Sequence, residues 1–189
     1  MSNYAFIAGL PATGKTALAA KIAKDLEMEH IEIDKWIEEL RSDPKLAPWV
    51  DFFNQKDEAD YWQKTDPTTH WQNLKNQAEA LWPAILERIS QVKQKPEKVL
   101  FESSIILPHI AHRDLNFPGV FLLGESEEKI LETIKQDPRW GKTSELQAQE
   151  AKNWFRFERL IIKTEAEIYN YKTFNELAGA EKELRWMLK

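Results

Sequence analysis

The stretch GLPATGKT, residues 9–16, decides how this chain folds. It satisfies the pattern G-x-x-x-x-G-K-[ST], in which the backbone of a glycine-rich turn wraps phosphate groups. Residues 4–8 are apolar and predict a buried strand before the motif. After it, Leu18, Ile22 and Leu26 recur every four residues, which predicts a helix with one apolar stripe. Strand, glycine turn and helix in this order favour a phosphate-binding loop over an ordinary strand-to-helix turn.

The residue types in the motif fit the chemistry of a nucleoside triphosphate. Gly9 and Gly14 give the backbone room to turn and approach the phosphates. The Lys15 ammonium reaches the β- and γ-phosphates, and the Thr16 hydroxyl is a ligand for Mg²⁺. We therefore expect ATP and Mg²⁺, with the nucleotide held by Gly9, Pro11, Ala12, Thr13, Gly14, Lys15, Thr16 and Ala17.

Hydrophobic periodicity predicts strands alternating with helices along the rest of the chain. Further strands are predicted at residues 30–33, 99–101, 120–123 and 171–174. Asp66 and Ser126 are predicted N-caps of the helices that follow them, and a long helix is predicted from about residue 144 to near residue 169. Residues 44–65 read as irregular and aromatic. The alternation predicts an α/β protein with three layers and a parallel sheet.

Composition limits the class of protein and its partners. A length of 189 residues fits one domain, residues 1–189, and 42% hydrophobic residues are enough for a core. The net charge of −5 argues against a nucleic-acid partner, and no apolar run is long enough to cross a membrane. The absence of cysteine fits a reducing cytoplasm.

The chain resembles the small P-loop kinases, the group that holds shikimate, gluconate and nucleoside monophosphate kinases. The segments GLPATGKTALAAKIAKDL, HIEID, VLFESSIILP and VFLLGESEEKILETIKQDPRW resemble it, and the last two are also similar to the 2-phosphoglycerate kinase and zeta-toxin branch. The resemblance implies a five-stranded parallel sheet and transfer of a phosphate to a small-molecule acceptor. It also implies a helical acceptor-binding insert at residues 35–98 and a lid with a long helix at residues 137–170. The oligomeric state stays open between monomer and homodimer.

Two acidic residues are candidates for the chemistry beside the loop. Asp34 follows the second predicted strand, at the sheet edge where open α/β sheets bind ligands, so it is expected to orient or deprotonate the acceptor hydroxyl. Its alternative role is the N-cap of the next helix. Glu102 follows the third strand, where an acid would hold Mg²⁺ or serve as the second candidate for the base. Its alternative is a solvent-exposed acid at a strand end.

The lid is expected to supply arginines that stabilise charge on the transferring phosphate. Arg139 and Arg156 are the predicted catalytic arginines, and Gly141 is a predicted hinge. Lys152, Arg156, Arg159 and Lys163 stand four, three and four residues apart, which predicts one basic helix face, with Trp154, Phe157 and Ile161 on another. The alternative is a solvated face paired with nearby glutamates.

The sequence is also consistent with other functions. A nucleoside monophosphate kinase needs phosphate-binding arginines in the insert, which offers Arg41 and Arg88. A nucleotide-binding regulatory module without an acceptor, and a toxin-like kinase acting on a sugar nucleotide, also fit the loop. The aromatic residues of the insert, among them Phe53 and Trp62, either line an acceptor pocket or form a satellite core. His70, His109 and His112 show no spacing typical of a metal site.

Overall fold

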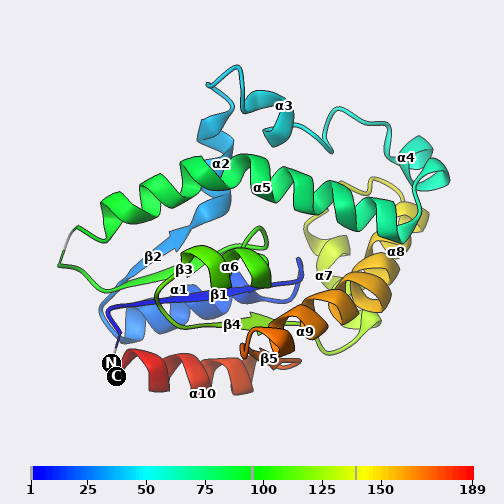
Figure 1. The fold of residues 1–189 in the computed structure, drawn as a ribbon. Coiled ribbons are helices and arrows are strands. Elements are labelled where there is room, and N and C mark those ends of the chain that lie inside the picture. The colour runs from blue at the N-terminus through cyan, green and yellow to red at the C-terminus, as the bar shows by residue number, and fades with distance from the viewer. Residues whose placement is uncertain (1, 95, 139) are drawn as a thin grey trace.

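The computed structural model describes residues 2–94, 96–138 and 140–189. A five-stranded sheet with the order β2-β3-β1-β4-β5 runs through its centre (Figure 1), and every neighbouring pair of strands is parallel. The strands are β1 (Tyr4–Gly9), β2 (Glu29–Glu32), β3 (Val99–Glu102), β4 (Gly119–Leu122) and β5 (Lys172–Phe174). The predicted α/β class and the five-stranded parallel sheet are thus confirmed.

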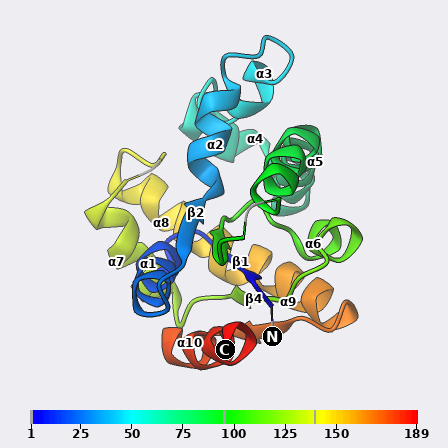
Figure 2. The same cartoon turned by 90° about the vertical axis from the view of Figure 1, so that its left-hand side faces the viewer.

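Helices cover both faces of the sheet because its strands are apolar on both faces. Ala5 and Ile7 of β1 pack with α1 (Lys15–Asp25) and α10 (Leu177–Leu188) in one core. Phe6 and Ala8 point the other way, into a core shared with the helices of the opposite face. Figures 1 and 2 show α1 and α10 on one side of the sheet, with α5 (Pro67–Val92) and α6 (Pro108–Asp114) on the other. The N- and C-termini lie side by side in both views.

The segment between β2 and β3 is helical. It contains α2 (Ile33–Leu40), α3 (Ala47–Val50), α4 (Glu58–Lys64) and α5. The predicted cap of α5 is confirmed, since an Asp66 side-chain oxygen accepts a hydrogen bond from the Thr69 N–H at 2.9 Å. The irregular reading of residues 44–65 was wrong in part. Asp57 caps α4 by accepting from the Asp60 N–H at 2.8 Å, which stabilises a helix too short to show apolar periodicity.

The long C-terminal helix predicted for residues 144–169 is interrupted. It consists of α8 (Ser144–Asn153), a π-helical turn η1 (Trp154–Glu158) and α9 (Arg159–Ile168), after the Ser126-capped helix α7 (Glu127–Gln136). A π turn bonds five residues along instead of four and so shifts the helical register. Trp154 and Glu158, four residues apart, are both buried, whereas Phe157 is 43% exposed, contrary to its predicted inward packing.

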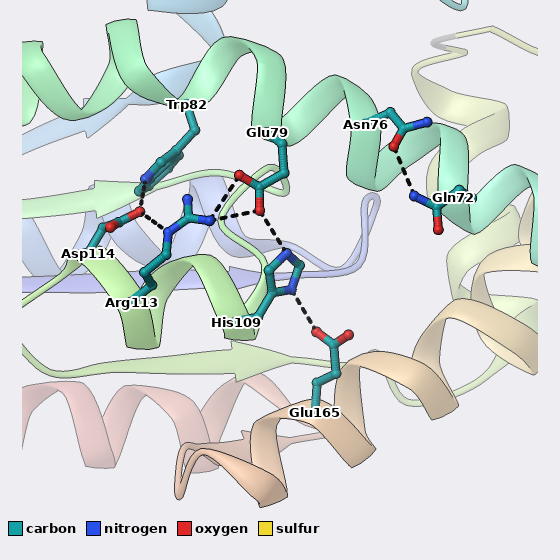
Figure 3. Close-up of polar contacts among 8 residues, drawn as sticks. All are labelled: Gln72, Asn76, Glu79, Trp82, His109, Arg113, Asp114 and Glu165. Carbon is teal, nitrogen blue, oxygen red and sulfur yellow. Dashed lines mark hydrogen bonds and ion pairs between the residues drawn. The ribbon is translucent and has the colours of Figure 1, made fainter.

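A polar network between α5, α6 and α9 fixes these helices to one another (Figure 3). His109 of α6 lies between Glu79 of α5, at 3.4 Å, and Glu165 of α9, at 3.0 Å. Beside it, the buried Trp82 Nε1 donates to Asp114 at 2.8 Å. The network connects α5 to α9 through α6. Among the described residues, no helix has the length and apolar content that a membrane span requires.

Candidate active site

The loop after β1 depends on two glycines in left-handed backbone conformations. Gly9 has φ +115°, and a Cβ at this position would lie 2.1 Å from the Leu122 carbonyl oxygen. Gly14 has φ +86°, with a Cβ at an ordinary 3.4 Å from Leu177. Gly9 therefore serves both conformation and close packing on β4, whereas Gly14 serves conformation alone.

The N-terminus of α1 opens onto the loop without a side-chain cap. Gly14 occupies the N-cap position, and its lack of a side chain leaves the first-turn N–H groups free of an internal side-chain acceptor. Lys15 is only 5% exposed, and its ammonium donates to the Leu10 carbonyl at 2.6 Å and to Ser104 Oγ at 3.1 Å. These groups place a cation and backbone donors around one concave turn, the arrangement that binds phosphate.

Thr16 and Glu102 bring two oxygens together beside Lys15. The Thr16 hydroxyl donates to Glu102 Oε2 at 3.0 Å, and Glu102 is 5% exposed. Burial raises the pKa of the Glu102 carboxyl, and nearby Lys15 partly offsets this effect. A hydroxyl and a carboxylate oxygen are the hard donors that Mg²⁺ takes, usually alongside several waters, so this pair fits that ion. The described residues contain no cluster of three or more His, Asp or Glu side chains for a metal.

Asp34 lies in the first turn of α2, two residues after the end of β2, which stops at Glu32 rather than at the predicted Ile33. Glu32 is the N-cap residue of α2, so capping does not account for Asp34. Instead, the Ser103 hydroxyl donates to Asp34 Oδ1 at 2.5 Å, and the same hydroxyl accepts from the Ile105 N–H at 3.2 Å. Asp34 and Glu102 therefore meet at the carboxyl ends of β2 and β3, as predicted for ligand-binding residues.

A cavity of about 330 Å³ joins the loop to the helices between β2 and β3. At one end it is lined by Gly9 and Pro11 of the loop and by Asp34 and Ser104. Its far end is aromatic, with walls from Phe53, Trp62, Trp71, Trp140 and Trp154. Of the insert aromatics, Phe53 and Trp62 line this cavity, while the Trp49 and Phe52 rings stack with their centroids 5.8 Å apart.

Buried polar side chains interrupt this aromatic wall. His70 is 3% exposed, and its Nδ1 lies 2.8 Å from the Tyr61 hydroxyl, which also accepts from Asn73 at 3.1 Å. His70 Nε2 approaches Glu158 Oε1 to 3.2 Å without a hydrogen-bonding alignment. Glu158 in turn accepts from the Asn153 amide at 2.8 Å. The π turn thus brings an acid from the C-terminal helices against a histidine of α5.

The basic residues predicted for the lid reach different elements. Arg156 is exposed and bonds Glu127 of α7, with Nε at 2.5 Å from Oε2. Arg159 instead donates to Asn175 at 2.8 Å and lies over the Phe155 ring. Gly141 is held by Glu150 Oε2, which accepts from its N–H at 3.2 Å. Arg139 lies outside the described residues, and the catalytic roles of Arg139 and Arg156 stay predictions.

Several residues of this site were missed by sequence reasoning. Ser103 and Ser104 directly follow Glu102 and could have been found from their place at the same strand end. His70, Glu150 and Glu158 gave no signal, because only the fold brings these helices to one cavity. Arg41 and Arg88, considered as phosphate-binding residues, pair with Glu38 and Glu39 at 2.6 Å each and do not line the cavity.

Comparison with known proteins identifies solved structures with a similar fold. No protein-family model matches the chain, and no curated protein does. The structure of a shikimate kinase from Acinetobacter baumannii in complex with shikimate is similar with a TM-score of 0.60 at 13% identity, covering 98% of this chain and 92% of that one. A shikimate kinase from Bacteroides thetaiotaomicron is similar with a TM-score of 0.55 at 16% identity, covering 98% and 97%. The chain therefore has the P-loop fold of the shikimate kinases, which agrees with the resemblance to small P-loop kinases seen in the sequence.

Proposed function

We propose that this chain is a phosphotransferase that moves the γ-phosphate of ATP to a hydroxyl of a small molecule. The observation that carries the proposal is the single cavity that places Gly9 and Pro11 of the phosphate loop beside Asp34. A phosphate donor and a hydroxyl acceptor need such a shared space to react in line. The structure of a shikimate kinase with bound shikimate supports a small acceptor. The absence of cysteine supports a cytoplasmic setting. We propose that the protein is a monomer or a homodimer.

The loop would hold the triphosphate through its backbone N–H groups. Lys15 would exchange its present acceptors, the Leu10 carbonyl and the Ser104 hydroxyl, for β- and γ-phosphate oxygens. Mg²⁺, when held by Thr16 and Glu102, supplies positive charge to the same phosphates. Glu102 faces Asp34 and Lys15 closely enough for its pKa to respond to both, so the metal side and the acceptor side are electrostatically linked.

Asp34 would act on the acceptor. Its carboxylate, oriented by Ser103, accepts the hydroxyl proton as the acceptor oxygen forms a bond to the γ-phosphorus. The bond from that phosphorus to the bridging oxygen breaks, and ADP leaves with the electron pair. Arg139 and Arg156 would stabilise the charge spread over the transferring group, for which Arg156 must leave Glu127.

An acceptor-dependent assay tests this function. The purified protein is incubated with ATP, Mg²⁺ and pools of hydroxylated metabolites, and ADP is measured. We expect ADP release only with pools that contain an acceptor, and loss of that release in Lys15→Ala and Asp34→Asn. Equal ADP release with every pool and with buffer would favour a plain nucleotide hydrolase. Nucleotide binding that survives without any turnover would favour a regulatory module.

A further inference from the structure

The walls of the acceptor cavity combine aromatic rings with negative charge. The carboxylates that line it belong to Asp34, Glu38, Glu150 and Glu158. Among the residues that the structure describes, no lysine or arginine lines it. At the aromatic end, the Glu158 carboxylate would repel a carboxylate or phosphate on the acceptor and would attract a cation.

The aromatic rings at one end of the cavity pack against one another and line the same space. The Trp62 and Trp140 ring centroids lie 6.0 Å apart, Phe53 and Trp140 5.7 Å, and Trp62 and His70 4.8 Å. Rings set around one space bind ammonium groups through their electron-rich faces, and tryptophan does so best. The Glu158 carboxylate lines the same cavity and is 4% exposed, so a cation bound there would be shielded from water.

An unsatisfied hydrogen-bonding group points to a ligand independently of the charge. His70 is 3% exposed, lines the cavity, and has no hydrogen bond at Nε2 within the described part of the chain. A Tyr61 hydroxyl that accepts from Asn73 and donates to His70 Nδ1 leaves Nε2 as the nitrogen that carries a proton, and Glu158 Oε1, 3.2 Å from Nε2, is not aligned to accept it. Buried donors normally have partners, and a ligand oxygen would supply one here.

We infer that the acceptor is a small hydroxylated compound that carries an ammonium group. Its ammonium group lies among Trp62, Trp140 and Glu158, and the hydroxyl to be phosphorylated lies near Asp34. This inference rests on the proposed phosphotransfer for the hydroxyl end only, since the recognition of the cation needs no nucleotide. A cavity of about 330 Å³ is at the lower end for ligand sites, which suits a metabolite rather than a macromolecule.

Matched ligands test the charge preference directly. Choline is compared with its neutral isostere 3,3-dimethylbutan-1-ol, and glucosamine is compared with glucose and glucuronate. Binding is followed without nucleotide by tryptophan fluorescence, because Trp62, Trp140 and Trp154 line the cavity. We expect the cation of at least one set to bind tenfold or more tightly than its neutral partner, and glucuronate to bind most weakly. Equal binding of cation and neutral partner in both sets overturns the inference.

Substitutions of carboxylates test whether the preference for a cationic ligand comes from the cavity. Glu158→Gln is expected to reduce the ratio of cation to neutral binding about tenfold and to leave neutral binding unchanged. Because Glu158 is buried against His70, Glu38→Gln serves as a second variant whose exposed side chain cannot unfold the protein, with a smaller loss expected. Glu167→Gln, on the exposed face of α9, is the control and should keep the full ratio. An unchanged ratio in both cavity variants contradicts the inference.

Two further measurements separate this inference from the proposed function. Calorimetry with MgATP tests the phosphate loop alone. Binding of the cationic ligand without binding of MgATP would contradict the kinase proposal and would support the inference that the cavity binds a cation. Conversely, the preferred binding of glucuronate, lost in Arg139→Ala, would show that an anion is recognised through Arg139 and would overturn the cationic acceptor while the kinase proposal stands.

Discussion

The Ser103 hydroxyl holds Asp34 by a hydrogen bond of 2.5 Å to Oδ1, across two strand ends that are distant in sequence. Ser103 is fully buried and also accepts from the Ile105 N–H, so its hydroxyl has no freedom to turn away. The bond fixes one oxygen of Asp34, the residue proposed to receive the acceptor proton. Ser103 is thus a positioning residue for a proposed base.

Removal of this bond should affect turnover more than binding. Ser103→Ala is expected to lower kcat about tenfold with little change in KM for ATP, because Asp34 keeps its charge and loses its orientation. Asp34→Asn removes the base and should lower kcat about 10²–10⁴-fold. Steady-state kinetics with an acceptor found in the assay above measures both. A lower Tm for Ser103→Ala with unchanged kcat would indicate a purely structural role.

The charge on Glu102 should cost stability in the absence of metal. Burial raises the pKa of this carboxyl, so the folded protein binds the proton more tightly than the unfolded chain does. Stability from this group is therefore present below the ordinary carboxyl pKa and is lost as pH rises through the raised folded value. Glu102→Gln keeps an acceptor for Thr16 without the charge, so it should raise Tm at neutral pH, by about 2–4 °C per kcal/mol gained.

The gain from Glu102→Gln should shrink as pH falls from the raised folded pKa of Glu102 to the ordinary glutamate value, below which both proteins are neutral at this position. Thermal unfolding at several pH values measures the difference. The same variant should bind ATP more weakly in the presence of Mg²⁺ than the parent does, and equally without it. A lower Tm at every pH would show that the charge is stabilising and would contradict the prediction.

The two loop glycines should differ in their tolerance of alanine. Gly9→Ala places a methyl group 2.1 Å from the Leu122 carbonyl oxygen in addition to a strained φ, and we expect a loss of about 2–5 kcal/mol. Gly14→Ala carries only the backbone strain, about 1–2 kcal/mol, since its Cβ has ordinary contacts. Urea unfolding of both variants gives the comparison. Equal losses would mean that the loop shifts away from β4 without cost.

Substitutions at the ion pair between Arg156 and Glu127 show whether Arg156 acts in catalysis or only in structure. Both side chains are at the surface, so Arg156→Ala and Glu127→Gln should leave Tm nearly unchanged. If Arg156 closes over the transferring phosphate, Arg156→Ala lowers kcat about 10³-fold or more, whereas Glu127→Gln frees the arginine and keeps or raises kcat. Equal, small effects of the two substitutions on kcat would remove Arg156 from the active site.

The sequence predicted the sheet well because each strand is short, apolar and followed by a turn or helix start. It failed where local signals are absent. Residues 58–64 form a helix that depends on a single Asp57 cap and on packing against the rest of the insert. The turn at Trp154–Glu158 was read as regular helix, since periodicity cannot distinguish one inserted residue from a change of face.

The phosphate side of the site was predictable and the acceptor side was not. The loop motif fixes Lys15 and Thr16 through contacts within a few residues, and strand ends located Asp34 and Glu102. His70 and Glu158 meet only because α5 and the C-terminal helices cross the same cavity. Their residue types alone carry no information about that meeting.

The π turn at Trp154–Glu158 is a place where a small change in sequence would alter the acceptor cavity. Deletion of Glu158 would shorten the π turn to a regular α-helical turn and would leave the two flanking helices, α8 and α9, in register. The cavity would lose the Glu158 carboxylate, whereas Ile162, the sheet and the loop would stay in place. A single-codon deletion could thus exchange one set of substrates for another without rebuilding the catalytic machinery.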